Sequence, residues 1–134
     1  MTKIAQRSDW KTEPMPSTSK LITVNEVYTR ADFDYIAAGV IPREMEDKWF
    51  VFYEEPWLYV HRSWTGYCIF KVRFEVVEEV SGISEVWVNR DAEQYKETGD
   101  LHDRDLLVTL LRGWSKRGNR EQMLNYVKSL SQDS

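Results

Sequence analysis

Hydrophobic and polar positions alternate most regularly between Asp47 and Arg90, a stretch that also holds four of the six tryptophans of the chain. Alternation with a period of two predicts β-strands, because successive side chains of a strand point to opposite faces of its sheet. Turn-forming residues divide the stretch into segments rich in aromatic and β-branched residues. The expected strands are Trp49–Glu54, Trp57–Ser63, Tyr67–Glu79 and Ser84–Arg90. The short turns between them predict an antiparallel meander.

The expected turns set the register between neighbouring strands. Trp64-Thr65-Gly66 suits a three-residue loop in which Gly66 takes the left-handed conformation of a bulge. That loop places Trp57 beside Arg73, whose guanidinium would lie over the indole ring. Ser81-Gly82 marks the last turn, and the register there is expected to need a bulge.

The alternation assigns side chains to two unequal faces of the predicted sheet. One face is mainly aliphatic and is the better core; it includes Val51, Leu58, Val60, Phe70, Val72, Phe74, Val86 and Val88. The other face combines aromatic rings with polar tips; it includes Phe50, Phe52, Trp57, Tyr59, His61, Lys71, Trp87 and Asn89. A sheet that is apolar on both sides must be covered twice or keep one face for a partner. We therefore expect the second face to be a wet cleft or a partner surface.

The N-terminal part of the chain lacks this order. Residues 1–20 contain Pro14 and Pro16 and show no sustained periodicity, which predicts an extended or mobile arm that Trp10 could tie down. Residues 21–134 are expected to form a single domain, since their length suits one hydrophobic core.

After Arg90 the apolar residues change to helical spacing. Leu106–Trp114 and Met123–Leu130 each carry an apolar stripe, and Asp91 can cap a short helix that reaches Tyr95. Further upstream, a short strand is expected at Leu21–Val24 and a short helix at Asp32–Ala38. The chain therefore predicts an α+β fold: an antiparallel four- to five-stranded meander sheet with two or three C-terminal helices packed on one face.

Composition and charge narrow the classes of function. A formal net charge of −4 supplies no basic field of the kind that drives nucleic-acid binding. No apolar run is long enough to span a bilayer and the first residues are polar, so we expect a cytoplasmic protein without membrane contact. One cysteine and two histidines cannot build a cysteine-rich zinc site, and no metal or cofactor is expected. Phosphate-binding glycine loops, HExxH, CxxC and nucleophile elbows are absent, which excludes the commonest nucleotide and metal enzymes.

Arg62 and Arg90 are candidate ligands for an anion. Both are expected at strand ends on the mainly aliphatic face, where a planar guanidinium could clamp a phosphate or a carboxylate. The alternative is that each arginine forms an ion pair inside the protein; the candidate partners are Asp91, Asp103 and Asp105. Backbone amides after Asn89 could bind the same anion, although a capping Asp91 would compete for them.

His61 and Trp64 are the other candidates with a chemical role. His61 could act as a general base or hydrogen-bond a ligand, and Ser63 lies two residues further on the same face. For Ser63 and His61 to make contact, their side chains would have to tilt toward each other along the strand. A hydrogen-bonded surface histidine is the simpler interpretation. Trp64 stands at a tight turn, either as an exposed anchor or as a lid on the core. The remaining candidate ligand-binding residues are Tyr59, Trp87 and Asn89.

Three segments, Asp47–Glu55, Trp57–Phe70 and Trp87–Asp91, together resemble a small family of uncharacterised bacterial proteins. Some of its members carry ADP-ribosylglycohydrolase-type names. True ADP-ribosylglycohydrolases use acidic residues and paired magnesium ions in a large helical fold, for which this chain is too short and too rich in strands. The resemblance implies at most a nucleotide or ADP-ribose context, not that mechanism.

Three hypotheses of function follow. The first is a non-catalytic module that binds a small anionic ligand or a protein partner through its aromatic, histidine and arginine surface. The second is a small enzyme acting on a nucleotide-like or ADP-ribosyl substrate, with His61 transferring a proton. The third is a homodimer in which the aromatic face is simply buried.

Overall fold

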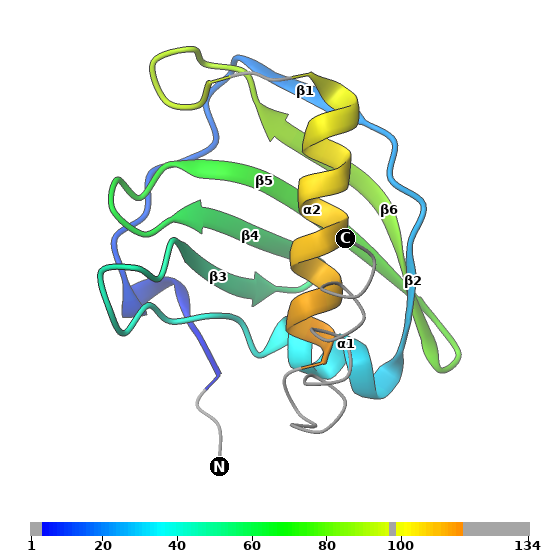
Figure 1. Ribbon diagram of the computed structural model, residues 1–134. Coiled ribbons are helices and arrows are strands. Elements are labelled where there is room, and N and C mark those ends of the chain that lie inside the picture. The colour runs from blue at the N-terminus through cyan, green and yellow to red at the C-terminus, as the bar shows by residue number, and fades with distance from the viewer. Residues whose placement is uncertain (1–3, 97–98, 117–134) are drawn as a thin grey trace, which may run out of the picture.

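The computed structural model describes residues 4–96 and 99–116 (Figure 1). A one-turn 3₁₀ helix at Arg7–Asp9 precedes the regular elements, which are β1 (Ser19–Ile22), β2 (Val27–Thr29), α1 (Arg30–Ala37), β3 (Trp49–Glu54), β4 (Trp57–Arg62), β5 (Cys68–Val77), β6 (Val80–Asn89) and α2 (Asp100–Ser115). Both helices of this part of the chain are too short or too polar to cross a membrane.

The six strands form one antiparallel sheet in the order β1-β6-β5-β4-β3, and β2 also pairs with β6. The α+β class and the meander from β3 to β6 are confirmed, with Trp57 opposite Arg73 as expected. The strand count is higher than predicted because Val27–Thr29, only three residues long, also pairs with β6. The first strand begins at Ser19, inside the segment that we expected to be an arm.

Both helices cover the same face of the sheet (Figure 1). Thr29 caps α1 by accepting the amide of Asp32, and the chain leaves this helix through Gly39 with a φ of 80°. The buried core joins residues of both helices to the aliphatic face; it includes Phe33, Ile36, Val60, Val72, Val86, Val88, Leu107 and Leu111. The predicted aliphatic core face is therefore confirmed.

The three helical segments predicted after β6 have different outcomes. The segment from Asp91 to Tyr95 is a turn, in which the carbonyl of Asp91 accepts the amides of Gln94 and Tyr95 at 2.9 Å each. The predicted stripe within Leu106–Trp114 lies in α2, as expected. The stripe at Met123–Leu130 lies outside the described residues.

The turn between β5 and β6 lies at Glu78-Glu79, not at Ser81-Gly82. Ser81 and Gly82 pair with Val76 and Glu75, so the strands continue past the predicted turn. Valines on both sides of the tip favour strand conformation and extend the hairpin. The expected bulge is present, between Arg73 and Phe74.

The cation over Trp57 is also not the one predicted. The Nζ atom of Lys71 lies 4.5 Å from the ring centroid of Trp57, whereas Arg73 donates to the hydroxyl of Ser84. Lys71 is the diagonal neighbour of Trp57 across the two strands, and its long side chain spans that separation.

The N-terminal segment covers part of the second face. Ala5 is buried against Phe50 and Phe52, and its amide donates to the carbonyl of Ala38 at 2.8 Å. The guanidinium of Arg7 lies 4.8 Å from the ring centroid of Phe52 and 4.9 Å from that of Tyr59. The expectation of a wet cleft on this part of the face is therefore wrong, because the chain itself covers the rings.

Candidate functional site

His61 lies inside the protein. It is 1% exposed, and its ring stacks on Phe52 with centroids 5.5 Å apart. Burial lowers the pKa of its imidazole, which keeps the ring neutral near pH 7. Its Nδ1 atom is 2.8 Å from the carbonyl of Gly66, which only accepts, so Nδ1 carries the proton. The interpretation as a surface histidine is wrong, and His61 instead holds the turn after β4.

Ser63 does not pair with His61. Its hydroxyl donates to the carbonyl of Asp47 at 2.6 Å, and its amide donates to the carbonyl of Lys48 at 2.9 Å. Each side chain of the imagined dyad is therefore committed to a different backbone carbonyl. Ser63 joins the turn after β4 to the segment before β3.

Asn89 organises the corner after β6. Its side-chain amide donates to the carbonyl of Cys68 and to Oε1 of Gln94, both at 2.9 Å. Its Oδ1 atom accepts the amide of Asp91, whose own carboxylate accepts the amide of Glu93. Four of the amides considered for an anion thus have partners within the chain, those of Asp91, Glu93, Gln94 and Tyr95.

Arg90 forms the internal ion pairs that we considered as its alternative role. Its guanidinium lies 2.7 Å from carboxylate oxygens of Asp100 and Asp103 at the start of α2. Asp103 is fully buried and also accepts the hydroxyl of Tyr95 at 2.5 Å. Among the predicted partners, Asp103 is confirmed. Arg90 therefore ties α2 to the end of β6, since a buried carboxylate needs its counter-charge.

Tyr59 and Trp87 are half-buried on the second face. Tyr59 stacks on Phe52 with centroids 5.0 Å apart and lies beneath Arg7. The indole N–H of Trp87 donates to Glu85 at 2.9 Å. Neither ring lines the cavity at the end of β4 that Arg62 and Trp64 border.

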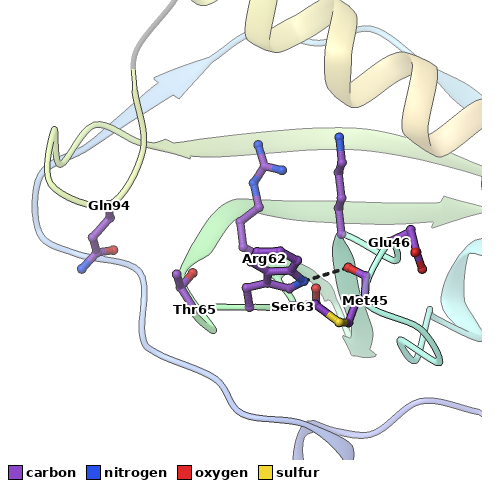
Figure 2. Close-up of a pocket in the computed structure, with 8 residues that line it drawn as sticks. Met45, Glu46, Arg62, Ser63, Thr65 and Gln94 are labelled. Carbon is purple, nitrogen blue, oxygen red and sulfur yellow. Dashed lines mark hydrogen bonds between the residues drawn. The ribbon is translucent and has the colours of Figure 1, made fainter.

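Arg62 and Trp64 border a hollow of about 670 Å³ at the end of β4 (Figure 2). It is formed where the turn after β4 meets the segment before β3, and Gln94 closes it from the corner after β6. Figure 2 shows Arg62 between Gln94 and Thr65 on one side and Met45 and Glu46 on the other. The full lining is Met45, Glu46, Lys48, Arg62, Ser63, Trp64, Thr65 and Gln94. We call this cavity the Arg62 hollow.

The guanidinium of Arg62 differs from that of Arg90 in its surroundings. It lies 4.4 Å from the ring centroid of Trp49, so an aromatic face supports it. No ion pair formed within residues 4–96 and 99–116 involves Arg62 or Lys48. Two cations at the rim are therefore available to an anion.

Trp64 is held in place although it is 66% exposed. Its indole N–H donates to the carbonyl of Met45 at 2.9 Å, which joins the two turns of the hollow. The carboxylate of Asp47 accepts the amides of Arg43 and Glu44 and so shapes the turn that carries Met45. Of the two interpretations of Trp64, this geometry fits an exposed anchor.

Sequence reasoning missed five of the lining residues: Met45, Glu46, Lys48, Thr65 and Gln94. They lie in irregular segments, where no periodicity marks a face. The one local signal is Asp47, whose spacing from Arg43 and Glu44 suits a side-chain-capped turn.

Comparison with known proteins finds no matching family model, and no curated protein or solved structure matches the chain. The resemblance to a bacterial family with ADP-ribosylglycohydrolase-type names therefore stays a prediction. Within the described part of the chain, no group of three or more His, Cys, Asp or Glu side chains is arranged to hold a metal ion.

Proposed function

We propose that this protein is a non-catalytic binding module whose Arg62 hollow captures an anionic group of a ligand or of a protein partner. One observation carries the proposal: the guanidinium of Arg62 stands at a hollow of about 670 Å³, supported by Trp49 and without an ion pair among the described residues. A planar guanidinium binds carboxylate and phosphate oxygens with two parallel hydrogen bonds.

The fixed orientations of Arg62 and Trp64 lower the entropic cost of binding a ligand. Contact with the indole of Trp49 restricts the orientation of Arg62 before a ligand arrives, and Trp64 is fixed by its bond to Met45. Preorganised side chains lose less conformational entropy on association. An exposed, fixed tryptophan beside a cation can also supply the aromatic anchor that dominates many interfaces.

The other candidate residues have less support as parts of a functional site. His61, which the enzyme hypothesis used to transfer a proton, is 1% exposed and donates to a carbonyl of its own turn. Arg90 is engaged by Asp100 and Asp103. The binding hypothesis thus has better support at the Arg62 hollow than the enzyme hypothesis has at His61.

The test is a thermal-shift panel followed by titration calorimetry. The panel contains inorganic phosphate, pyrophosphate, nucleotides, sugar phosphates and short acidic peptides, since a ligand of the folded state raises the melting temperature. For the probe that binds, we expect Arg62→Gln to weaken affinity by about 10- to 100-fold, equivalent to about 1.5–3 kcal/mol for hydrogen bonds to a charged group.

Arg104→Gln is the matched control, because this exposed arginine of α2 lies away from the hollow. Its affinity for the same probe should equal that of the wild type. Equal binding by Arg62→Gln and wild type would contradict the proposal. A protein mass that rises with concentration would instead favour the homodimer hypothesis.

A further inference from the structure

A second hollow lies on the other side of Trp64. It measures about 500 Å³, and its lining residues are Trp10, Lys11, Arg43, Glu44, Met45, Ser63 and Trp64. Met45, Ser63 and Trp64 border both hollows, so the indole of Trp64 stands between two adjoining cavities. We call the second cavity the Trp10 hollow.

The walls of the Trp10 hollow are fixed by the N-terminal segment. The indole N–H of Trp10 donates to the carbonyl of Ser63 at 2.6 Å, and the amide of Glu13 donates to the carbonyl of Gly66 at 2.8 Å. A Cβ atom on Gly66 would lie 3.2 Å from the carbonyl oxygen of Lys11, so this close passage favours glycine. Trp10 and Trp64 therefore both bond through their N–H groups and keep ring surface in solvent.

The surface around the two hollows has the composition of an interface core. Met45 is 74% exposed, Trp64 66% and Trp10 38%. Tryptophan, methionine and arginine are the residue types enriched where proteins bind one another. Large apolar side chains gathered on one exposed surface mark an interaction site.

The charge of this surface differs from that of the whole chain. Its cations are Lys11, Arg43, Lys48 and Arg62; its carboxylates are Glu44 and Glu46, with that of Asp47 beside them in the turn that carries Met45. The local charge is therefore positive, although the formal net charge of the chain is −4. Complementary charge favours an acidic partner.

We propose that the two hollows together bind an extended acidic segment of a partner protein, with an apolar side chain packed on Trp64 and one acidic group in each hollow. This rests on the proposed function of the Arg62 hollow and adds the class of its partner. A small ligand fills one cavity of this size, whereas two cavities divided by a ring suit a longer chain. Nucleic acid fits less well, because Glu44 and Glu46 interrupt the positive charge that a phosphate backbone requires.

The experiment selects partners without assuming their sequence. A random dodecapeptide library displayed on phage is panned against the full-length wild-type protein. We expect the enriched peptides to combine several Asp or Glu residues with at least one large apolar residue. The most enriched peptide is then synthesised with a fluorescent label, and its affinity is measured by anisotropy.

Variants of both hollows separate this inference from the proposed function. We expect a loss of at least about tenfold in affinity for Arg62→Gln, for the double variant Lys11→Gln/Arg43→Gln, and for Trp64→Ala. The matched control is Arg30→Gln/Arg104→Gln, which removes two exposed cations elsewhere and should bind as the wild type does. Circular dichroism melting of each variant shows whether the fold is kept.

Any result other than the expected one contradicts the inference. If Arg62→Gln weakens binding and Lys11→Gln/Arg43→Gln does not, the ligand uses the Arg62 hollow alone, and only the proposed function stands. If neither variant weakens binding, both proposals fail. Absence of enrichment, enrichment of basic peptides, or tighter binding of a ten-residue oligothymidine than of the peptide would show that the partner class is wrong.

Discussion

At the scale of single residues, two arginines with the same expected position have different roles. Arg62 ends β4 and Arg90 directly follows β6, two strands that β5 separates in the sheet, yet Arg90 meets the carboxylates of α2 and Arg62 meets the indole of Trp49. A guanidinium paired with a buried carboxylate is committed to the fold, while one on an aromatic ring keeps its hydrogen-bond donors for a ligand. Neighbours from distant parts of the chain decide which role each arginine takes.

His61 predicts a pH dependence of stability. Burial lowers the pKa of His61 in the folded protein below its usual 6.5, so below about that pH the unfolded chain binds more protons than the folded one. Stability contributed by the neutral ring is thus present above pH 6.5 and is lost as pH falls through 6.5 toward the folded pKa. The slope for one proton is at most about 1.4 kcal/mol per pH unit.

The measurement is the free energy of unfolding by urea, for the wild type and for His61→Phe, at several pH values from about 7.5 to about 5.5. The variant keeps an aromatic ring beside Phe50 and Phe52, and the carbonyl of Gly66 keeps the amide of Glu13 as a partner. We expect a flatter pH profile than that of the wild type. Equal slopes in His61→Phe and in the wild type would contradict the assignment.

At the scale of elements, the end of α1 sets how the N-terminal segment meets the sheet. Gly39 has a φ of 80°, and a Cβ atom there would lie 2.2 Å from the carbonyl oxygen of Val51 and 2.7 Å from Cβ of Ala5. The backbones of three segments therefore converge at this one glycine. The predicted helix ended at Ala38, just before Gly39, but the close packing around this glycine became visible only in the fold.

Gly39→Ala should destabilise the protein by about 2 kcal/mol or more. The new Cβ atom would clash with the carbonyl of Val51, and the left-handed backbone conformation is unfavourable for a residue with a side chain. Gly113→Ala is the matched comparison, since Gly113 lies in α2 with open space around it. There alanine should stabilise by about 0.5–1 kcal/mol through its higher helix propensity. Urea denaturation measures both changes, and the same sign for both would refute the packing argument.

At the scale of the whole molecule, the two faces of the sheet are covered by different means. Helices α1 and α2 pack on the aliphatic face, while the segment from Ala5 to Glu13 crosses the aromatic one. Arg7 joins this cover to the sheet edge through Glu54, with hydrogen bonds of 2.8 and 3.1 Å. The cover seals Phe50, Phe52 and His61, and it also builds one wall of the Trp10 hollow.

Deletion of residues 1–16 should therefore destabilise the domain by at least about 3 kcal/mol, since Phe50 and Phe52 are fully buried under this segment and each contributes about 1.5–3 kcal/mol on burial. We expect a lower urea midpoint and new binding of a hydrophobic dye. Arg7→Ala keeps the chain in place and should give a smaller loss. An unchanged midpoint after deletion would show that the segment contributes nothing to the cover.

The sequence by itself determined the α+β class, the four strands of the meander from β3 to β6 and the aliphatic core face. These depend on local alternation, which the geometry of each strand imposes on its own residues. The strand-end position of Arg62 and the turn carrying Trp64 were predictable for the same reason.

Only the tertiary structure decided that the chain covers its own aromatic face, that Arg90 is paired while Arg62 is open, and that two hollows flank Trp64. Each of these depends on contacts between segments far apart in the chain, such as Trp10 with Ser63 and Arg90 with Asp103. A periodic pattern assigns a side chain to a face, but it does not specify what lies against that face. What covers each face therefore depends on the packing of segments that are distant in the chain.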